Sequence, residues 1–164
     1  MRQRSQRELT EKKFVELRIA RQWRIFEQAN PPLSHFILDS NMLLRSVQDA
    51  SVLYEQILHL IDLSELPYIR LHILPRLAPL SWLLVAGSVA TILYDFAAAE
   101  RHSVVCIEDH LGAIHSSDNP FEVESYTTAF NDLDSRALST EASVAFMRDA
   151  ALQVLRTGNT PGVQ

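Results

Sequence analysis

The chain has 164 residues, of which 47% are hydrophobic and 21% are charged, so it has the size and composition of one globular domain. These figures exclude long disorder, collagen and an isolated coiled coil for most of the chain. A single cysteine excludes a disulfide framework and any cysteine-rich zinc module. With four glycines in all, no loop can cradle the phosphates of a nucleotide.

The charge of the chain is unevenly distributed. Residues 1–24 carry a net charge of +5 within a chain whose total is −5, so the remainder carries −10. The acidic remainder should repel nucleic acid, because phosphate binding needs clustered cations. The basic segment is interpreted as a solvated helix face, with a contact to DNA or to an acidic partner as the alternative.

A long helix is predicted over residues 6–29, because apolar residues recur there with the spacing of one helix face. The residues of this face are Val15, Ile19, Trp23 and Phe26. Two prolines at 31 and 32 stop the helix. The short apolar segment 33–38 then predicts a strand, and a turn is expected at Asp39-Ser40-Asn41.

A second helix is predicted over residues 47–63, with Asp49 near its start, where the helix dipole favours an acid. Pro67 ends this helix, and residues 68–74 alternate apolar and polar side chains, which is typical of a half-buried strand. Further strands are expected in three segments, 83–85, 89–96 and 103–107. Together these strands predict an antiparallel sheet of about four strands.

Residues 77–94 contain no charge and just reach the length that spans a membrane. Pro79 and several β-branched residues instead favour two buried strands around a turn near Gly87. No apolar segment follows the basic start, so a signal peptide is not expected. We therefore expect a cytoplasmic protein, with membrane attachment through 77–94 as the less favoured alternative.

Two helices are predicted at the C-terminal end. Asn119 followed by Pro120 is a typical helix start, and Ser139 is placed to cap a last helix that Gly158 closes. The expected order is helix, strand, helix, three strands and two helices. Such segregated runs indicate an α+β fold, with an antiparallel sheet of about four strands packed against four main helices.

Five stretches of the chain resemble one family. They are Leu17–Gln22 (LRIARQ), Ile37–Arg45 (ILDSNMLLR), Tyr54–Pro75, the VVCIED strand followed by Gly112, and Ala129–Ser143 (AFNDLDSRALSTEAS). Their order and spacing resemble the C-terminal domain of unknown function that follows a helix-turn-helix of the Xre type in many actinobacterial transcription regulators. The likeness spans residues 12–150.

The resemblance implies the non-enzymatic sensing or interaction half of a regulator. We expect it to bind a protein partner or a second copy of itself, with a small-molecule effector as a further ligand and without a cofactor. Direct DNA binding is not expected of this chain, because it shows no helix-turn-helix. We expect a single effector domain over residues 1–157 and a flexible tail over 158–164. An enzyme that acts on an apolar metabolite is the alternative.

The densest polar set in the sequence lies around one predicted strand. It comprises His102, Cys106, Glu108, His110 and His115. Neither a metal site nor a catalytic thiol is expected, because paired close ligands are missing and Cys106 reads as a small buried hydrophobe. A buried Glu108 would have to be paired or neutralised. The candidate ligand-binding residues, which would line a pocket, are Trp82, Tyr94, Cys106 and Glu108.

Overall fold

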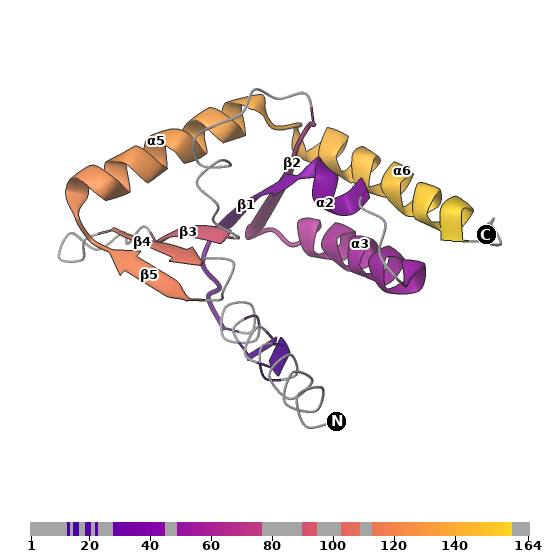
Figure 1. Cartoon of the computed structure of the whole chain (residues 1–164), viewed down its shortest axis with the longest axis horizontal. Helices are drawn as coiled ribbons and strands as arrows, with labels where there is room; N and C mark the ends of the chain where they lie inside the picture. Colours follow the sequence, from indigo (N-terminus) through magenta and orange to yellow (C-terminus); the bar gives the residue numbers. More distant parts are fainter. Residues whose placement is uncertain are drawn as a thin grey trace, which may run out of the picture.

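The structure of the chain is a computed structural model that describes residues 28–44, 49–76, 90–94, 103–108 and 113–158, together with six positions between 13 and 22. In chain order its elements are β1 (Ser34–Asp39), α2 (Ser40–Leu44), α3 (Ala50–Ser64), β2 (Ile69–Leu74), β3 (Ala90–Tyr94), β4 (Val104–Glu108), β5 (Ile114–Ser117), α5 (Pro120–Arg136) and α6 (Thr140–Gly158). The described residues form a mixed α+β fold with four helices, which confirms the predicted class (Figure 1).

The strands form two small sheets, so the prediction of one antiparallel sheet was wrong. β1 and β2 pair in parallel, with Ser34 opposite Ile69 and Asp39 opposite Leu74. β3, β4 and β5 form an antiparallel sheet in that order. β1 and β2 are parallel because the chain between them runs through α2 and α3. A helical crossover of this kind brings the second strand back in the same direction as the first.

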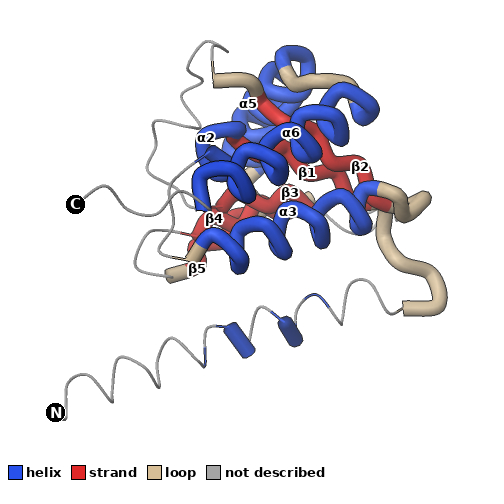
Figure 2. Tube along the Cα trace, turned by 90° about the vertical axis from the view of Figure 1, so that its right-hand side faces the viewer, coloured by secondary structure: helices blue, strands red, loops and turns tan. Residues whose placement is uncertain are grey.

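One face of the β1–β2 sheet packs against α3 and α6 and forms the core. Alternation along β2 places Ile69, Leu71 and Ile73 on this face, and each is buried. The buried helix residues of this core are Leu43, Ile57, Ile61, Met147, Ala150, Ala151 and Val154. The two helices lie side by side over the sheet (Figures 1 and 2). The alternation predicted for residues 68–74 is therefore confirmed.

The helices begin at side chains that cap their free backbone N–H groups. Asp49 accepts a hydrogen bond from the backbone N–H of Ser51 at 2.9 Å, at the start of α3. Asn119 accepts one from the backbone N–H of Phe121 at 3.0 Å, and Pro120 occupies the first turn of α5. The Ser139 hydroxyl accepts one from the N–H of Ala142 at 3.3 Å. The predicted starts at Asn119 and Ser139 are thus confirmed.

The connection between α5 and α6 closes the outer edge of β2. The N–H of Leu138 donates to the carbonyl oxygen of Ile73 at 2.9 Å. The N–H of Ile73 donates to the hydroxyl of Ser143 at 2.9 Å, and that hydroxyl donates to the carbonyl of Leu138 at 3.2 Å. Both backbone groups of Ile73 are therefore paired on the side that faces away from β1.

Two local predictions differ from the structure. The turn expected at Asp39-Ser40-Asn41 is the start of the short helix α2, where the Asp39 carboxylate accepts from the backbone and side-chain N–H groups of Asn41. β5 was not predicted, because its residues, Ile114–Ser117, are mostly exposed and half of them are serine. An exposed edge strand of this kind lacks the apolar alternation from which strands are recognised.

Several predictions lie wholly or partly outside the described residues. They are the strand 83–85, the turn near Gly87, most of the helix 6–29 and the tail from residue 159 onward. The described positions between 13 and 22 are helical, in agreement with the predicted helix. Among the residues that the structure describes, no helix has the length and hydrophobicity needed to cross a membrane.

Candidate functional site

The side of α3 that faces away from the core is exposed and acidic. Its residues, named here the α3 outer face, are Val52, Glu55, Gln56, His59 and Asp62. They share one side because their spacing of three or four residues matches the helix period. Residues 49–65 contain four acids and no lysine or arginine. This face therefore presents negative charge around one large apolar side chain, Val52, which is 62% exposed.

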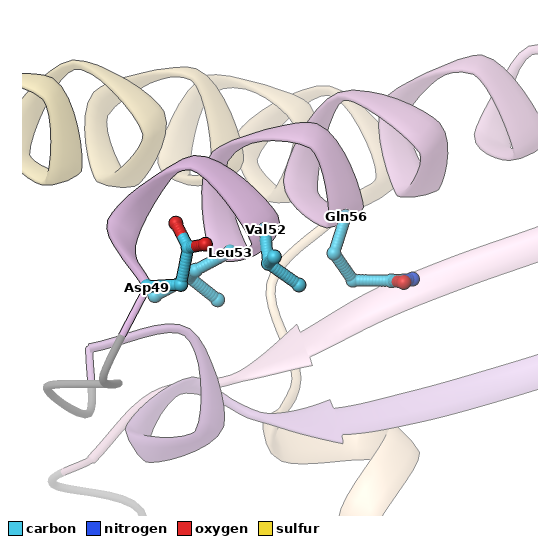
Figure 3. Close-up of a pocket in the computed structure, with 4 residues that line it drawn as sticks. All are labelled: Asp49, Val52, Leu53 and Gln56. Atoms are coloured by element: carbon cyan, nitrogen blue, oxygen red, sulfur yellow. The ribbon is translucent and has the colours of Figure 1, made fainter. Parts of the chain in front are cut away.

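A hollow of about 280 Å³ opens at the first turns of α3 (Figure 3). It is lined by Asp49, at the N-terminal cap of α3, and by Val52, Leu53 and Gln56 in its first two turns. Pockets that enclose drug-sized ligands usually have volumes of about 300–1,000 Å³. The hollow lies at the lower end of this range, is open to solvent and is lined mostly by apolar surface, so an apolar side chain of another protein segment could fill it.

Neighbouring elements add apolar surface at the same end of the molecule. α2, the first turns of α3 and the last turns of α6 gather there (Figures 1 and 2). The exposed large apolar side chains on α2 and α6 are Met42, Leu44, Leu152 and Leu155. Apolar side chains gathered on a soluble domain mark interaction sites more often than isolated ones do. This end of the molecule is therefore a candidate interaction surface.

The N-terminal segment carries the opposite charge. Val15 and Ile19 occupy helical positions and are 56% and 46% exposed, so the rest of the chain leaves them largely uncovered. They lie four residues apart, which places them on one face of the helix. Residues 1–24 carry a net charge of +5. A basic segment with an apolar face is thus matched in charge and hydropathy to the α3 outer face.

Three of the four residues predicted to bind a ligand lie on one face of the antiparallel sheet. Tyr94 pairs with Val104 on β4, which also holds Cys106 and Glu108. Cross-strand partners and alternate residues point to the same side of a sheet, so these three side chains share a face. Trp82 lies outside the described residues. Ligand binding by this set stays a prediction.

The environment of the single cysteine differs from the prediction. Cys106 is half-buried, whereas its neighbour Val105 is fully buried on the opposite face of the sheet. The interpretation of Cys106 as a buried hydrophobe was therefore wrong. It rested on the apolar neighbours of Cys106 in the sequence, which suggested a strand buried on both faces. Glu108 is likewise half-buried. Tyr94 is 39% exposed at the other end of the face.

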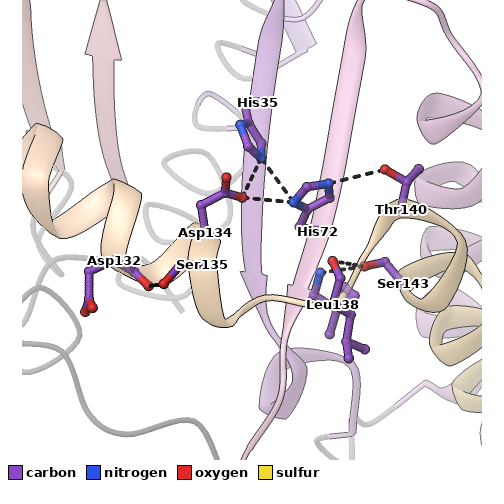
Figure 4. A network of polar contacts seen from close by, with 9 residues as sticks. His35, His72, Asp132, Asp134, Ser135, Leu138, Thr140 and Ser143 are labelled. Carbon is purple, nitrogen blue, oxygen red and sulfur yellow. Dashed lines mark hydrogen bonds and ion pairs between the residues drawn. The ribbon is translucent and has the colours of Figure 1, made fainter.

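A polar cluster that the sequence did not reveal joins β1, β2 and α5 (Figure 4). His35 Nε2 lies 3.0 Å and His72 Nδ1 lies 2.9 Å from the same carboxylate oxygen of Asp134, Oδ1. The two imidazole nitrogens are 3.3 Å apart. His72 Nε2 lies 3.2 Å from the hydroxyl oxygen of Thr140, at the start of α6. The cluster therefore links four elements of the fold.

The parallel register explains why the two rings meet. His35 is opposite Arg70 and His72 is opposite Ile37, so both imidazoles lie on the sheet face that the core does not use. α5 packs on that side, and its last turn brings one carboxylate oxygen of Asp134 within reach of both rings. From the sequence, the visible signal is a polar residue at an alternating position of each strand. Only the strand pairing shows that these positions are adjacent.

Burial lowers the pKa of His35 below its ordinary value. The carboxylate of Asp134 opposes this shift, and the nearby His72 and Arg70 add to it. The edge of the Phe130 ring also packs against His35, with ring centroids 5.1 Å apart. His35 is thus held as a neutral imidazole near neutral pH, which leaves one ring nitrogen with a free electron pair.

Comparison with known proteins identifies the family. Neither the curated proteins nor the solved structures yielded a match. The family model described as "Domain of unknown function (DUF5753)" matches residues 1–149, which is nearly the whole chain. The chain therefore belongs to the DUF5753 family.

Proposed function

We propose that this chain is a non-enzymatic interaction domain that associates with a second copy of itself. Its resemblance to the C-terminal part of Xre-type regulators of actinobacteria suggests that this association serves transcription regulation. The supporting observation is the complementarity between the basic N-terminal segment and the acidic α3 outer face. Both surfaces carry exposed apolar side chains, Val15 and Ile19 on one and Val52 on the other.

Electrostatic and hydrophobic terms act together in this proposal. Opposite charges on two surfaces speed their encounter and fix their orientation. Removing apolar area from water contributes about 25 cal/mol per Å². The hollow beside Val52 and Leu53 offers a place where Val15 or Ile19 of another copy can be buried. Charge therefore guides the contact, and the apolar residues supply much of its free energy.

A second copy, rather than the same chain, is the proposed occupant. Val15 and Ile19 remain about half exposed within one chain, which shows that its own surfaces do not cover them. In a two-fold dimer each copy supplies one segment and one face, so both exposed surfaces are covered in a closed arrangement. Such closure avoids open-ended assembly.

Sedimentation velocity over a wide range of protein concentration tests the proposal. We expect the wild-type chain to form a dimer that dissociates as the salt rises from 0.1 M to 1 M, where the Debye length falls from about 10 Å to about 3 Å. Val52→Glu should yield monomers, because it adds a charge to the apolar centre of the α3 outer face.

Phe121→Glu is the matched control. Phe121 is 80% exposed at the start of α5, on a different part of the body from α3. This variant should remain dimeric. A wild-type chain that stays monomeric at every concentration, or a dimer that neither salt nor Val52→Glu weakens, would contradict the proposal.

A further inference from the structure

We propose that His35, His72 and Asp134 form a binding site for a divalent transition-metal ion such as Zn²⁺. The inference is independent of self-association, because the cluster lies beneath α5 and not on the α3 outer face. It rests on the geometry of three donor atoms that two strands and one helix bring together.

The separations of the donor atoms fit a coordination shell. Zinc binds nitrogen and carboxylate oxygen at about 2.0–2.2 Å, so two ligand atoms at octahedral or tetrahedral angles lie about 2.8–3.6 Å apart. In the cluster, the three separations among His35 Nε2, His72 Nδ1 and Asp134 Oδ1 are 2.9, 3.0 and 3.3 Å. An ion near the centre of this triangle would contact all three atoms after small side-chain adjustments.

The donor types also suit such an ion. Two imidazole nitrogens and one carboxylate oxygen are common ligands of Zn²⁺ and of non-haem Fe²⁺, and three protein ligands leave a further position for water or another ligand. His35 and His72 project from paired strands, which hold their relative positions more firmly than loops would.

A second layer of contacts would orient the ligands. When Nδ1 of His72 binds the ion, its Nε2 carries the proton and donates to the Thr140 hydroxyl, 3.2 Å away. Phe130 packs edge-on against the ring of His35.

The competing explanation is a hydrogen-bonded bridge without metal. In it, both imidazole N–H groups donate to Asp134 Oδ1 and hold the last turn of α5 on the sheet. The two explanations differ in one measurable respect. A metal site binds added Zn²⁺ with a defined stoichiometry through these three residues, whereas a hydrogen-bonded bridge does not.

Calorimetric titration of the metal-free chain with Zn²⁺ tests the inference. We expect one ion per chain, and we expect His72→Gln and Asp134→Asn each to weaken binding by more than about tenfold, since each removes a direct ligand. His59→Gln and Cys106→Ser should leave the affinity unchanged. His59 is an exposed histidine of α3, and the thiol of Cys106 is the other soft ligand that Zn²⁺ favours.

Nuclear magnetic resonance of the histidine rings in the wild-type chain gives a readout that does not depend on the folding of variants. Added Zn²⁺ should shift the ring signals of His35 and His72 and leave those of His59 and His115 in place. Absence of binding to the wild-type chain, binding that persists in both ligand variants, or shifts confined to other histidines would overturn the inference.

Discussion

Replacing Ser143 with alanine tests how β2 is held at its outer edge. Ser143 is fully buried, and its hydroxyl accepts a hydrogen bond from the backbone N–H of Ile73 at 2.9 Å. The same hydroxyl donates to the carbonyl of Leu138 at 3.2 Å. In Ser143→Ala the backbone N–H of Ile73 remains buried but has no acceptor. β1 cannot supply one, because it pairs with the opposite edge of β2.

The structure allows the loss to be estimated. A buried donor left without a partner destabilises a protein by about 1–3 kcal/mol. Alanine is a better helix former than serine, so the substitution within α6 also regains about 0.5 kcal/mol of stability. The free energy of unfolding should therefore fall by about 1.5 kcal/mol. For a chain of this size, each kcal/mol lowers the melting temperature by about 2–4 °C, so the shift should be about 3–6 °C.

Urea and thermal unfolding followed by circular dichroism measure this change. Ser125→Ala is the control, because Ser125 is an exposed helix serine whose hydroxyl donates to the Phe121 carbonyl at 2.7 Å, within α5. The control should change stability by less than about 0.5 kcal/mol. Equal stabilities for Ser143→Ala and Ser125→Ala would refute the role assigned to the buried hydroxyl.

Three further predictions concern the core, the metal site and a helix cap. Ile57 is fully buried between α3 and the sheet, so Ile57→Ala should lower the free energy of unfolding by about 2–5 kcal/mol and Ile57→Val by about 0.5–1.5 kcal/mol. Urea unfolding measures both changes, and equal losses for the two variants would argue against close packing around Ile57. Zn²⁺ at one hundred times the wild-type dissociation constant should stabilise the chain by about 2.7 kcal/mol in calorimetry, and a tenfold or larger loss of affinity in Asp134→Asn should reduce this gain to about 1.4 kcal/mol or less. Hydrogen bonds from the side chain and backbone of Ser51 hold the pKa of Asp49 below its ordinary value. The ionised carboxylate of Asp49 therefore stabilises the fold above its unfolded-state pKa of about 3.9. This stabilisation is lost as the pH falls through the lower pKa that Asp49 has in the folded state. The stability difference between wild type and Asp49→Ala should accordingly narrow in acid, and a difference that widens there would contradict this sign.

Local patterns in the sequence were enough to predict most of the described elements. The alternation of residues 68–74 predicts β2 because one face of that strand packs on the core and the other does not. Asn119 and Pro120 mark the start of α5 through the hydrogen-bonding chemistry of a helix terminus. Such signals depend only on neighbours in the chain, so no knowledge of the tertiary fold is needed to recognise them.

Strand pairing could not be predicted in the same way. The apolar pattern of 33–38 and the alternation of 68–74 are the same for a parallel and an antiparallel pair, so the direction depends on the path of the chain between them. The His35–His72–Asp134 cluster could not be predicted either, because its members lie on three separate elements that only the tertiary fold brings together. Cys106 and Glu108, in contrast, share a face through simple alternation along one strand.

In the proposed dimer, the N-terminal segment of one copy lies on the α3 outer face of another. Disulfide formation between two single-cysteine chains tests it directly, because a disulfide requires Cα atoms within about 7 Å. Both chains carry Cys106→Ser, one with Ile19→Cys and the other with Val52→Cys. Phe121→Cys in place of Val52→Cys is the control.

After mixing and mild oxidation, we expect a cross-linked species that contains one copy of each chain, at a yield well above that of the Phe121→Cys control. A single chain that carries both new cysteines should form intermolecular rather than internal disulfides. A yield equal to the control, or closure of the doubly substituted chain on itself, would contradict the claim.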